Sequence, residues 1–432
     1  MIMRFFYTQE MNITALYQLY TKHFLVDTDT RNIRENTLFF ALKGENFNGN
    51  EFAEKALDLG ASFAIIDDKN YQTQKNMIVV DDVLETLQKL ANYHRKQLTI
   101  PVIGLTGSNG KTTTKELINV VLSKKYNCLA TKGNLNNHIG VPLTLLSIKP
   151  EHEIAIIEMG ANHQKEIEFL CTICEPDFGY ITNFGKAHLE GFGGIEGVIK
   201  GKSELYTFLE KHHKTVFINS TDAIQVEKTK NLNTIAISSD EIRFLEVNPF
   251  VKIDYKNTSI QSNLVGKYNY TNIAIAITIG EYFKVSKADI KEAIESYTPK
   301  NNRSQIIETK TNKIILDAYN ANPSSMKVAL ENFASLVHSK KVIILGDMFE
   351  LGKDSQQEHQ EIVNLANSLG FQNQYFVGEH FYQTKTDSQQ FKTFDDFESY
   401  IKKNPLENQY ILIKGSRGMR LERVLESLDV VR

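Results

Sequence analysis

The stretch TGSNGKTTT at residues 106–114 is the feature that most narrows what this chain can fold into. It follows an apolar run at residues 100–105 and opens a helical pattern over residues 111–122, the strand, turn and helix of a phosphate-binding loop. Glycine lets backbone N–H groups turn inward, and the helix N-terminus adds positive potential. Lys111 can reach the outer phosphates, and the Thr112 hydroxyl can ligate Mg²⁺. The sequence therefore predicts a site for ATP or GTP.

This loop is shorter than the general GxxxxGK[ST] pattern, because Leu105 stands five residues before Gly110. A glycine-rich turn can also merely connect a strand to a helix, but here lysine and threonine follow the turn in register. The predicted contacts of the nucleotide are Gly107, Ser108, Asn109, Gly110, Lys111, Thr112 and Thr113.

Length and charge exclude several classes of protein. The 432 residues predict two to four domains, with three as the central value. The 49 lysines and arginines nearly balance 52 acidic residues, so no field of one sign can hold nucleic acid or an anionic membrane. Hydrophobic residues make up 41% of the chain, enough for substantial cores. Any anion that the protein binds needs a local site.

Cysteine usage and the N-terminus favour a cytoplasmic protein. Three cysteines do not suit a disulfide framework, the N-terminus lacks the apolar core of a signal peptide, and no apolar run approaches about 18 residues. Cys171 and Cys174 form one CxxC pair inside a helical pattern, too little for zinc, and His212-His213 suits a solvated helix end. We expect no membrane span and nothing that demands more than a monomer.

Strand and helix patterns alternate in three blocks, at residues 1–98, 99–300 and 301–432. The predicted fold class is α/β, with a small N-terminal α/β domain, a central domain with a mostly parallel sheet covered on both faces, and a third α/β domain. Residues 242–265 are typical of antiparallel strands. In such sheets ligands bind beyond the carboxyl ends of the strands, so residues just past each apolar run are candidates.

The third block has its own signals. Residues 304–309 and 313–317 predict a hairpin, and Pro323 suits the first position of a helix. Strands and helices then alternate, and the pattern ends with an expected helix over residues 419–428. This alternation predicts another α/β domain.

Two side chains just past apolar runs could hold a metal. Glu158 follows the run at residues 154–157, where a carboxylate could meet the phosphate loop and suit Mg²⁺; a solvated acid with a capping role is the alternative. His188 follows the strand pattern at residues 178–182 within a glycine-rich loop. A loop histidine is more often exposed or locally hydrogen-bonded than a metal ligand.

Longer motifs resemble those of one enzyme family. NLNNHIGVP at residues 134–142, EMGA at 158–161 and NFGKAHLEGF at 183–192 are similar, with the TGxxGKT loop, to central-domain motifs of the Mur ligases. These are the ATP-dependent amide-forming enzymes of bacterial cell-wall precursor synthesis. DAYNANPSSM at 317–326 and LGDMFELG at 345–352 resemble the branch that adds D-alanyl-D-alanine. The matches follow family order over nearly the whole chain.

The resemblance implies a three-domain enzyme. Residues 1–98 would bind the UDP-sugar, residues 99–300 would bind ATP, and a Rossmann-like domain at 301–432 would bind the incoming dipeptide and close on ATP. The implied reaction joins D-Ala-D-Ala to UDP-N-acetylmuramoyl-tripeptide and releases ADP and phosphate, in peptidoglycan synthesis. A carboxylate is a poor electrophile, so transfer of the γ-phosphoryl group would first make an acyl phosphate.

The resemblance also implies catalytic roles. Lys111 would clamp the outer phosphates, and Thr112, Glu158 and His188 would hold Mg²⁺, with two ions expected. Lys202 matches a lysine that many Mur ligases carry as a carbamate, a bidentate anionic metal ligand. From the residues alone, a solvated lysine is the better interpretation of Lys202.

Four further residues match ATP contacts of the family. The resemblance implies that Asn272 contacts the adenine, that Arg303 reaches the phosphates, and that Asp317 and Tyr319 lie near the ribose and base. Local caps are the alternatives for Asn272 and Asp317. This chain has Tyr268 where the family commonly has histidine.

The sugar nucleotide has its own candidate segment. Thr30-Arg31 and FFALKGENFNGN at residues 39–50 resemble the uridine-binding segment of the family. An Asn-rich turn is an adequate alternative account of Asn136 and Asn137, which we assign to the sugar or diphosphate. The predicted substrate contacts are Thr30, Arg31, Lys43, Gly44, Asn48, Gly49, Asn136 and Asn137.

Other functions stay open at this point. A sibling Mur ligase that adds the third amino acid typically shows a DNPR-type sequence where this chain has DAYNANP, and a folylpolyglutamate synthase belongs to the same class. A non-ligase NTPase would need the phosphate loop but not Glu158, His188 and Lys202 together. A ligase should release ADP only with an acceptor carboxylate and a donor amine, whereas a motor or switch should need neither.

Overall fold

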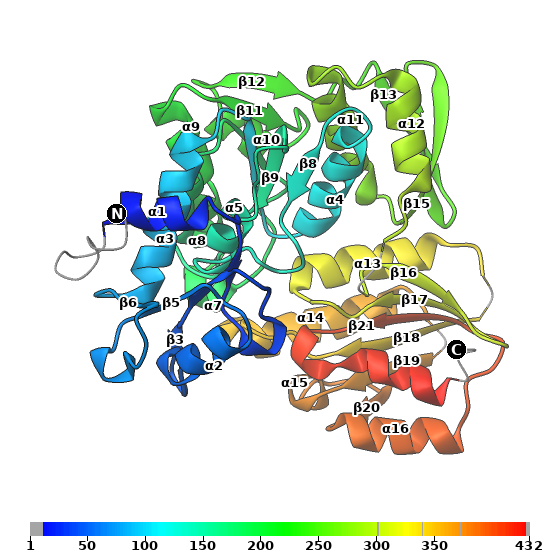
Figure 1. Cartoon of the computed structure of the whole chain (residues 1–432). Helices are drawn as coiled ribbons and strands as arrows, with labels where there is room; N and C mark the ends of the chain where they lie inside the picture. Colours follow the sequence, from blue (N-terminus) through cyan, green and yellow to red (C-terminus); the bar gives the residue numbers. More distant parts are fainter. Residues whose placement is uncertain (1–11, 300–301, 339, 372, 429–432) are drawn as a thin grey trace.

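The computed structural model describes residues 12–299, 302–338, 340–371 and 373–428. The first eleven residues and the expected domain boundary at 300–301 lie outside the described residues. The chain forms three α/β parts, each around its own parallel or mostly parallel sheet (Figure 1). The blue N-terminal part and the yellow-to-red C-terminal part both lie against the central part.

The N-terminal part is a four-stranded parallel sheet in the order β1-β2-β5-β6. Its helix α3 begins after Asp82, whose carboxylate accepts the backbone N–H of Glu85. A short hairpin, β3 with β4, projects beside this sheet. The elements are α1 (Ile13–Tyr20), β1 (Val26–Asp27), β2 (Leu38–Phe40), β3 (Lys43–Gly44), β4 (Phe47–Asn48), α2 (Ala53–Asp58), β5 (Phe63–Ile66), β6 (Met77–Val79) and α3 (Val83–Gln97).

The central sheet has six parallel strands in the order β12-β11-β10-β7-β9-β8. Its middle strands are fully buried, because side chains from alternate positions face cores on both sides. The strands are β7 (Val102–Thr106), β8 (Cys128–Ala130), β9 (Ile154–Glu158), β10 (Phe178–Ile181), β11 (Thr215–Ile218) and β12 (Asn233–Ala236). The predicted parallel sheet with both faces covered is confirmed.

Helices pack on the two faces of this central sheet. On one face, α4 packs against α11 and contributes Leu117 and Val121 to a core that also contains Ile103 of β7. The other face carries α6 and α9, with Ile167 and Leu205 buried beneath them. The helices are α4 (Lys111–Leu122), α5 (Gly140–Leu145), α6 (Glu166–Cys174), α7 (Leu189–Phe192), α8 (Ile195–Lys202), α9 (Glu204–Lys211), α10 (Ala223–Lys228), α11 (Asn269–Tyr282) and α12 (Lys287–Ser296).

A small antiparallel sheet completes the central part. It consists of β13 (Ile242–Val247), β14 (Phe250–Tyr255) and β15 (Thr258–Val265), and α12 packs against β15. The antiparallel strands expected from residues 242–265 are therefore confirmed.

The C-terminal part has a six-stranded sheet in the order β16-β17-β21-β18-β19-β20, in which only the β16–β17 pair is antiparallel. The hairpin and the helix that begins at Pro323 are both as predicted. The elements are β16 (Gln305–Glu308), β17 (Lys313–Asp317), α13 (Pro323–Ser335), β18 (Lys341–Gly346), α14 (Ser355–Ser368), β19 (Asn373–Val377), α15 (Glu379–Tyr382), β20 (Gln389–Phe391), α16 (Phe394–Lys403) and β21 (Tyr410–Lys414).

The end of the described chain corrects one expectation. The single helix expected over residues 419–428 is wrong, because two 3₁₀ helices, Arg417–Met419 and Leu421–Ser427, stand there. Arg420 between them has a left-handed backbone with φ of +49°, which a continuous right-handed helix cannot contain.

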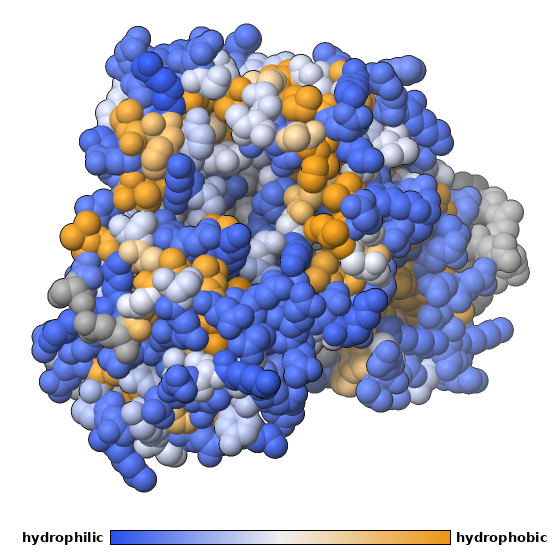
Figure 2. All heavy atoms as spheres, turned by 180° about the vertical axis from the view of Figure 1, so that it is seen from behind, coloured by the Kyte–Doolittle hydropathy of each residue, from blue (hydrophilic) through white to orange (hydrophobic). Residues whose placement is uncertain are grey.

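The face opposite to the one in Figure 1 carries no single large hydrophobic patch. That face is mostly hydrophilic, with small hydrophobic groups scattered over it (Figure 2). Within the described part of the chain, no helix is both long enough and apolar enough to cross a membrane.

Candidate active site

One cavity of about 1120 Å³ lies where the carboxyl ends of the central strands face the C-terminal part. Its wall includes six phosphate-loop residues, from Ser108 to Thr113, and Glu158 at the end of β9. Asn136, Asn137 and His188 also line it, as do Asn272, Arg303, Asp317 and Tyr319. These fourteen residues, all predicted from sequence, therefore line one cavity.

Two glycines shape the phosphate loop. Gly107 has φ of +138°, and a Cβ there would stand 2.0 Å from the Thr182 hydroxyl, so only glycine fits. Gly110, with φ of +80°, ends the loop just before α4. The Thr182 hydroxyl donates to the carbonyl of Asn109 at 2.6 Å, and Ser108 donates its N–H to Asn183 at 3.0 Å. The end of β10 therefore holds the loop open toward the cavity.

Lys111 opens α4 at the edge of this loop. Its ammonium donates to the carbonyl oxygens of Gly107 at 2.7 Å and Ser108 at 3.1 Å. Burial lowers the pKa of Lys111, while the nearby Glu158 carboxylate opposes that shift. The Lys111 side chain thus lies within the loop itself, where the phosphates of a nucleotide would lie.

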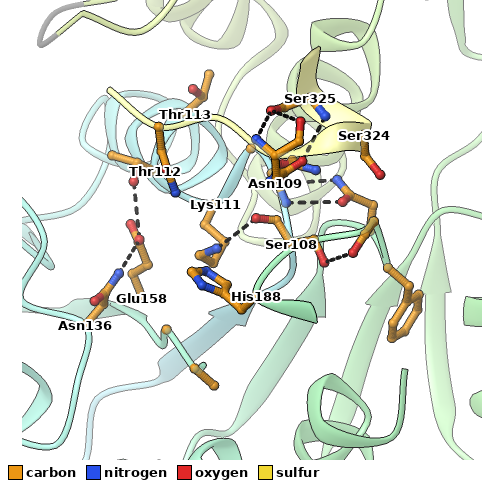
Figure 3. A pocket seen from close by; sticks show the side chains of 18 of the residues that line it. Ser108, Asn109, Lys111, Thr112, Thr113, Asn136, Glu158, His188, Ser324 and Ser325 are labelled. Carbon is orange, nitrogen blue, oxygen red and sulfur yellow. Dashed lines mark hydrogen bonds between the residues drawn. The ribbon is translucent and has the colours of Figure 1, made fainter. Parts of the chain in front are cut away.

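Glu158 is a buried carboxylate with one satisfied oxygen and one free oxygen. The residue is 1% exposed, and its Oε1 accepts from the Thr112 hydroxyl at 3.2 Å and from the Asn136 amide at 2.9 Å (Figure 3). Its Oε2 has no hydrogen-bond partner within the described part of the chain. An unpaired buried carboxylate oxygen is costly, so this atom indicates a partner that the protein itself does not supply.

The donor set beside that free oxygen fits Mg²⁺. A carboxylate and a threonine hydroxyl are hard oxygen ligands, and Mg²⁺ is usually bound by one or two carboxylates together with substrate phosphates. Among the described residues, no cluster of three or more histidine, cysteine, aspartate or glutamate side chains is placed to hold a metal. The chain therefore offers a part of a coordination shell that a nucleotide would complete.

His188 lines the cavity but has a partner in the C-terminal part. Its backbone is left-handed, with φ of +53°, and its Nδ1 pairs with Oε2 of Glu350. The hydrogen bond from His188 lowers the pKa of the Glu350 carboxyl, against the opposing effect of burial. One ring nitrogen of His188 thus takes part in a contact between two domains. Its role as a metal ligand stays a prediction.

Lys202 lies behind the cavity wall rather than in it. The side chain is 1% exposed at the end of α8, its ammonium donates to the carbonyl of Ala161 at 3.0 Å, and it lies 4.9 Å from the centre of the Phe192 ring. The alternative of a solvated lysine is wrong. Burial, with the charge of Lys111, holds the pKa of Lys202 well below its usual value.

The C-terminal wall of the cavity contains pairs of its own. The Arg303 guanidinium stacks on the Tyr319 ring at 3.6 Å, and Asp317 accepts from Lys414 at 2.5 Å and from the N–H of Ser304 at 3.0 Å. Lys414 is a cavity residue that the sequence interpretation missed. The available signal was its place just past the apolar run at residues 410–413.

Asn272 lies inside α11, one turn after the helix begins at Asn269, so the capping alternative is wrong. Its side-chain oxygen accepts from the Thr114 hydroxyl at 3.0 Å and its amide donates to Asn269 at 2.8 Å. A Cβ at Gly110 would stand 3.0 Å from the same oxygen. Asn272 is thus packed against the phosphate loop, and its adenine contact stays a prediction.

The N-terminal candidates lie apart from this cavity. Arg31 pairs with Asp29 at 2.6 Å, and Lys43 pairs with Asp67 at 2.8 Å. Gly49 approaches the chain closely, since a Cβ there would stand 2.3 Å from the carbonyl oxygen of Leu42. The structure does not bring Thr30, Arg31, Lys43, Gly44, Asn48 and Gly49 into the cavity lining.

The two motifs that we set aside have structural explanations. Cys171 and Cys174 are buried within α6 as free thiols, and burial raises the pKa of both. His212 and His213 are exposed just after α9 ends.

Comparisons with known proteins agree with this geometry. Three family models match: the Mur ligase family catalytic domain at residues 23–95, the Mur ligase middle domain at 105–280 and the Mur ligase glutamate ligase domain at 302–417. The UDP-N-acetylmuramoyl-tripeptide–D-alanyl-D-alanine ligase of Bacillus subtilis is 34% identical, over 93% of this chain and 92% of the relative.

Solved structures give the same result. A crystal structure of MurF from Acinetobacter baumannii matches with a TM-score of 0.82 and 30% identity, over 93% of this chain and 92% of that one. MurF from Thermotoga maritima in complex with ADP also matches with a TM-score of 0.82, at 26% identity over 95% and 98% of the two chains. The chain therefore belongs to the Mur ligase family and has the three-domain fold of that family.

Proposed function

We propose that this ligase joins D-alanyl-D-alanine to UDP-N-acetylmuramoyl-tripeptide, with conversion of ATP to ADP and phosphate, in peptidoglycan precursor synthesis. The observation that carries the proposal is the free carboxylate oxygen of Glu158 beside Thr112 and Lys111, in a cavity shared with the C-terminal part. The name of the B. subtilis relative states this reaction, and the relative aligns along nearly the whole chain, which supports the choice of substrates.

The central part is proposed to hold the nucleotide phosphates. Lys111 and the backbone N–H groups of the loop would bind them, and Arg303 would approach from the C-terminal wall with its forked donors. Glu158 and Thr112 would hold Mg²⁺, with His188 and a carbamate of Lys202 proposed for a second ion. When bound, such ions neutralise charge as a carboxylate approaches a phosphate.

The chemistry follows in two transfers. An oxygen of the tripeptide carboxylate attacks the γ-phosphorus and ADP leaves, which gives an acyl phosphate. The neutral amine of the dipeptide then attacks the acyl carbon, the C–O bond to phosphate breaks, and the nitrogen loses a proton. Lys111, which lies on the phosphate loop, would favour the first transfer by stabilising charge on the phosphoryl oxygens.

The N-terminal part is proposed to bind the uridine end of the substrate. Thr30 and Arg31 lie in a short 3₁₀ helix that follows β1. Lys43, Gly44 and Asn48 lie in the β3–β4 hairpin, which Gly49 directly follows. Asn136 and Asn137 line the cavity and would meet the sugar or diphosphate. Gln88 of α3 donates to the carbonyl of His138 at 3.0 Å and so ties the N-terminal part to this Asn-rich loop.

We further propose that residues 1–98, 99–300 and 301–432 are the three functional domains, and that the enzyme acts in the cytoplasm as a monomer. Light scattering on a size-exclusion column tests the last point. A mass near 49.2 kDa is expected, and a mass near twice that value would contradict it.

The proposed reaction is tested by release of ADP from purified protein. ADP should form only when ATP, UDP-N-acetylmuramoyl-tripeptide and D-Ala-D-Ala are all present, and mass spectrometry should detect the pentapeptide product. L-Ala-L-Ala and free D-glutamate are matched control amines. Turnover with a single amino acid in place of the dipeptide would indicate a sibling ligase, and turnover with neither acceptor nor amine would indicate a simple NTPase.

A further inference from the structure

One hydrogen bond joins the tip of the phosphate loop to the C-terminal part. The amide nitrogen of Asn322 donates to the side-chain oxygen of Asn109 at 2.7 Å, across 213 positions of sequence. Both residues line the cavity, and Asn322 is 7% exposed. Figure 3 shows Asn109 beside the first turn of α13, close to Ser324 and Ser325.

Asn109 is held on its other sides by the central part. Its N–H donates to the side-chain oxygen of Asn183 at 3.2 Å. Its carbonyl accepts from Thr182 at 2.6 Å and from the Asn183 amide at 3.0 Å. The main chain of this loop residue is thus fixed by the end of β10, whereas its side-chain oxygen depends on the C-terminal part alone among the hydrogen bonds of the described chain.

Asn322 has a second, separate task. Its side-chain oxygen accepts the N–H of Ser325 at 2.9 Å, and the Ser325 hydroxyl in turn accepts the N–H of Asn322 at 3.1 Å, which caps α13. The capping oxygen and the bridging amide belong to opposite ends of one planar group. A residue that only needed to cap this helix could be serine or aspartate, so capping leaves the amide unexplained.

We propose that Asn322 is a positioning residue of the ligase, which acts through Asn109 to fix the tip of the phosphate loop when the C-terminal part is docked. The inference rests on the nucleotide site of the proposed function and adds to it a link between two domains. Because the coupling is reciprocal, a nucleotide that orders the loop also favours docking of the C-terminal part. Docking of the C-terminal part thereby changes the position of the loop atoms that are proposed to bind phosphate.

The first test measures the affinity of the full-length protein for ADP with Mg²⁺ by calorimetry. Asn322→Ser keeps a capping oxygen but is too short to reach Asn109, and Asn322→Ala loses both contacts. A neutral hydrogen bond corresponds to about a two- to tenfold change in affinity. We expect both variants to weaken ADP binding equally within that range, while Asn322→Ala, which also loses the helix cap, lowers the midpoint of thermal unfolding of the nucleotide-free protein further than Asn322→Ser does.

A double-mutant cycle tests whether Asn322 acts through Asn109. Asn109→Ala should weaken ADP binding by itself, and adding Asn322→Ser to it should cause no further loss. If Asn322→Ser weakens binding by the same factor with and without Asn109, or leaves the affinity of the otherwise native protein unchanged, the proposal is wrong.

A second contact between the same domains provides the matched control. Lys186 pairs with Glu358 at 2.6 Å, and among the hydrogen bonds of the described residues neither side chain has one to the phosphate loop. Lys186→Met should leave the affinity for ADP within about twofold of native, since this pair joins the two domains without holding the phosphate loop. A loss as large as that of Asn322→Ser would mean that any weakening of the interface suffices, and would overturn a specific bridge.

Kinetics give an independent readout once the ligase assay works. Asn322→Ser should raise KM for ATP by the same factor as it weakens ADP binding and should leave KM for the UDP-linked peptide unchanged. If the native protein ligates no dipeptide, the proposed function fails, but the calorimetric comparison still decides the role of Asn322. A changed KM for the UDP-linked peptide with unchanged ADP affinity would contradict the inference.

Discussion

The two walls of the cavity are built in different ways. On the central wall, Glu158 at the end of β9 accepts hydrogen bonds from Thr112 of α4 and from Asn136 of a loop, and all three belong to the central part. On the C-terminal wall, Arg303 stacks on Tyr319 within its own domain, and it approaches the central wall only because the domains are docked. In the proposed mechanism, the groups for the chemical step are thus preorganised within one domain, whereas the groups that bind the nucleotide come from two.

The largest effect is expected on the central wall. Glu158→Gln should lower kcat by at least about 100-fold, because it removes the anionic oxygen while keeping the shape and the accepting carbonyl. Steady-state ADP release measures this. Glu166→Gln is the matched control, since that acid also lines the cavity but accepts backbone N–H groups of Asn162 and His163. Comparable losses in both variants would remove the distinction that we draw for Glu158.

Substitution of Lys202 tests whether a residue buried behind the central wall also takes part in the reaction. If the proposed carbamate forms, Lys202→Met should reduce turnover by about 100-fold, and formate or acetate should restore part of the activity of Lys202→Ala. Full turnover in either variant would show that no carbamate is needed.

Lys202→Met is expected to reduce turnover without reducing stability. In the protein without the carbamate, the buried ammonium of Lys202 costs free energy, so Lys202→Met should not lower the midpoint of thermal unfolding. Because the pKa of Lys202 is lower in the folded state, the unfolded state binds more protons, and the native protein gains stability relative to Lys202→Met as pH rises toward the ordinary lysine value. Thermal unfolding across a pH series checks the sign.

A smaller effect is expected on the C-terminal wall. Arg303→Ala should raise KM for ATP by about tenfold, in line with the loss of charge-assisted hydrogen bonds, while kcat changes less. Arg303→Lys should recover only part, because an ammonium can neither form the bidentate fork nor stack as a plane on Tyr319. A fall in kcat with KM unchanged would place Arg303 among the groups of the chemical step and erase the contrast between the walls.

The smallest effect is expected far from both walls. Lys43 is about half exposed and already paired with Asp67, so Lys43→Ala should raise KM for the UDP-linked peptide by no more than about threefold. Lys89→Ala, which breaks a comparable surface pair with Glu85 on α3, is the control and should change nothing. No difference between the two variants would argue against a uridine site at the β3–β4 hairpin.

Local chemistry explains which parts of this molecule were predictable. The helix predicted over residues 111–122 matches α4, because apolar periodicity and a glycine before the first turn define such a helix. The 3₁₀ turns near residue 420 were not predictable, since a left-handed arginine has no marker in sequence.

Contacts across large sequence separations could not be predicted from the chain alone. The pairs Asn109 with Asn322, His188 with Glu350, and Lys414 with Asp317 are set by domain docking and strand order. Strand-end position and family motifs indicated that Glu158 belongs to the site, but only the structure reveals that one of its oxygens is unpaired.

Diffraction from crystals grown with Mn²⁺ and a non-hydrolysable ATP analogue tests the central claim most directly. Mn²⁺ replaces Mg²⁺ at oxygen sites and gives an anomalous signal. We predict a peak in contact with the free oxygen of Glu158 and the Thr112 hydroxyl, with the nucleotide phosphates in the loop at Lys111. An empty loop, or a metal peak with Glu158 turned away from it, would contradict the account.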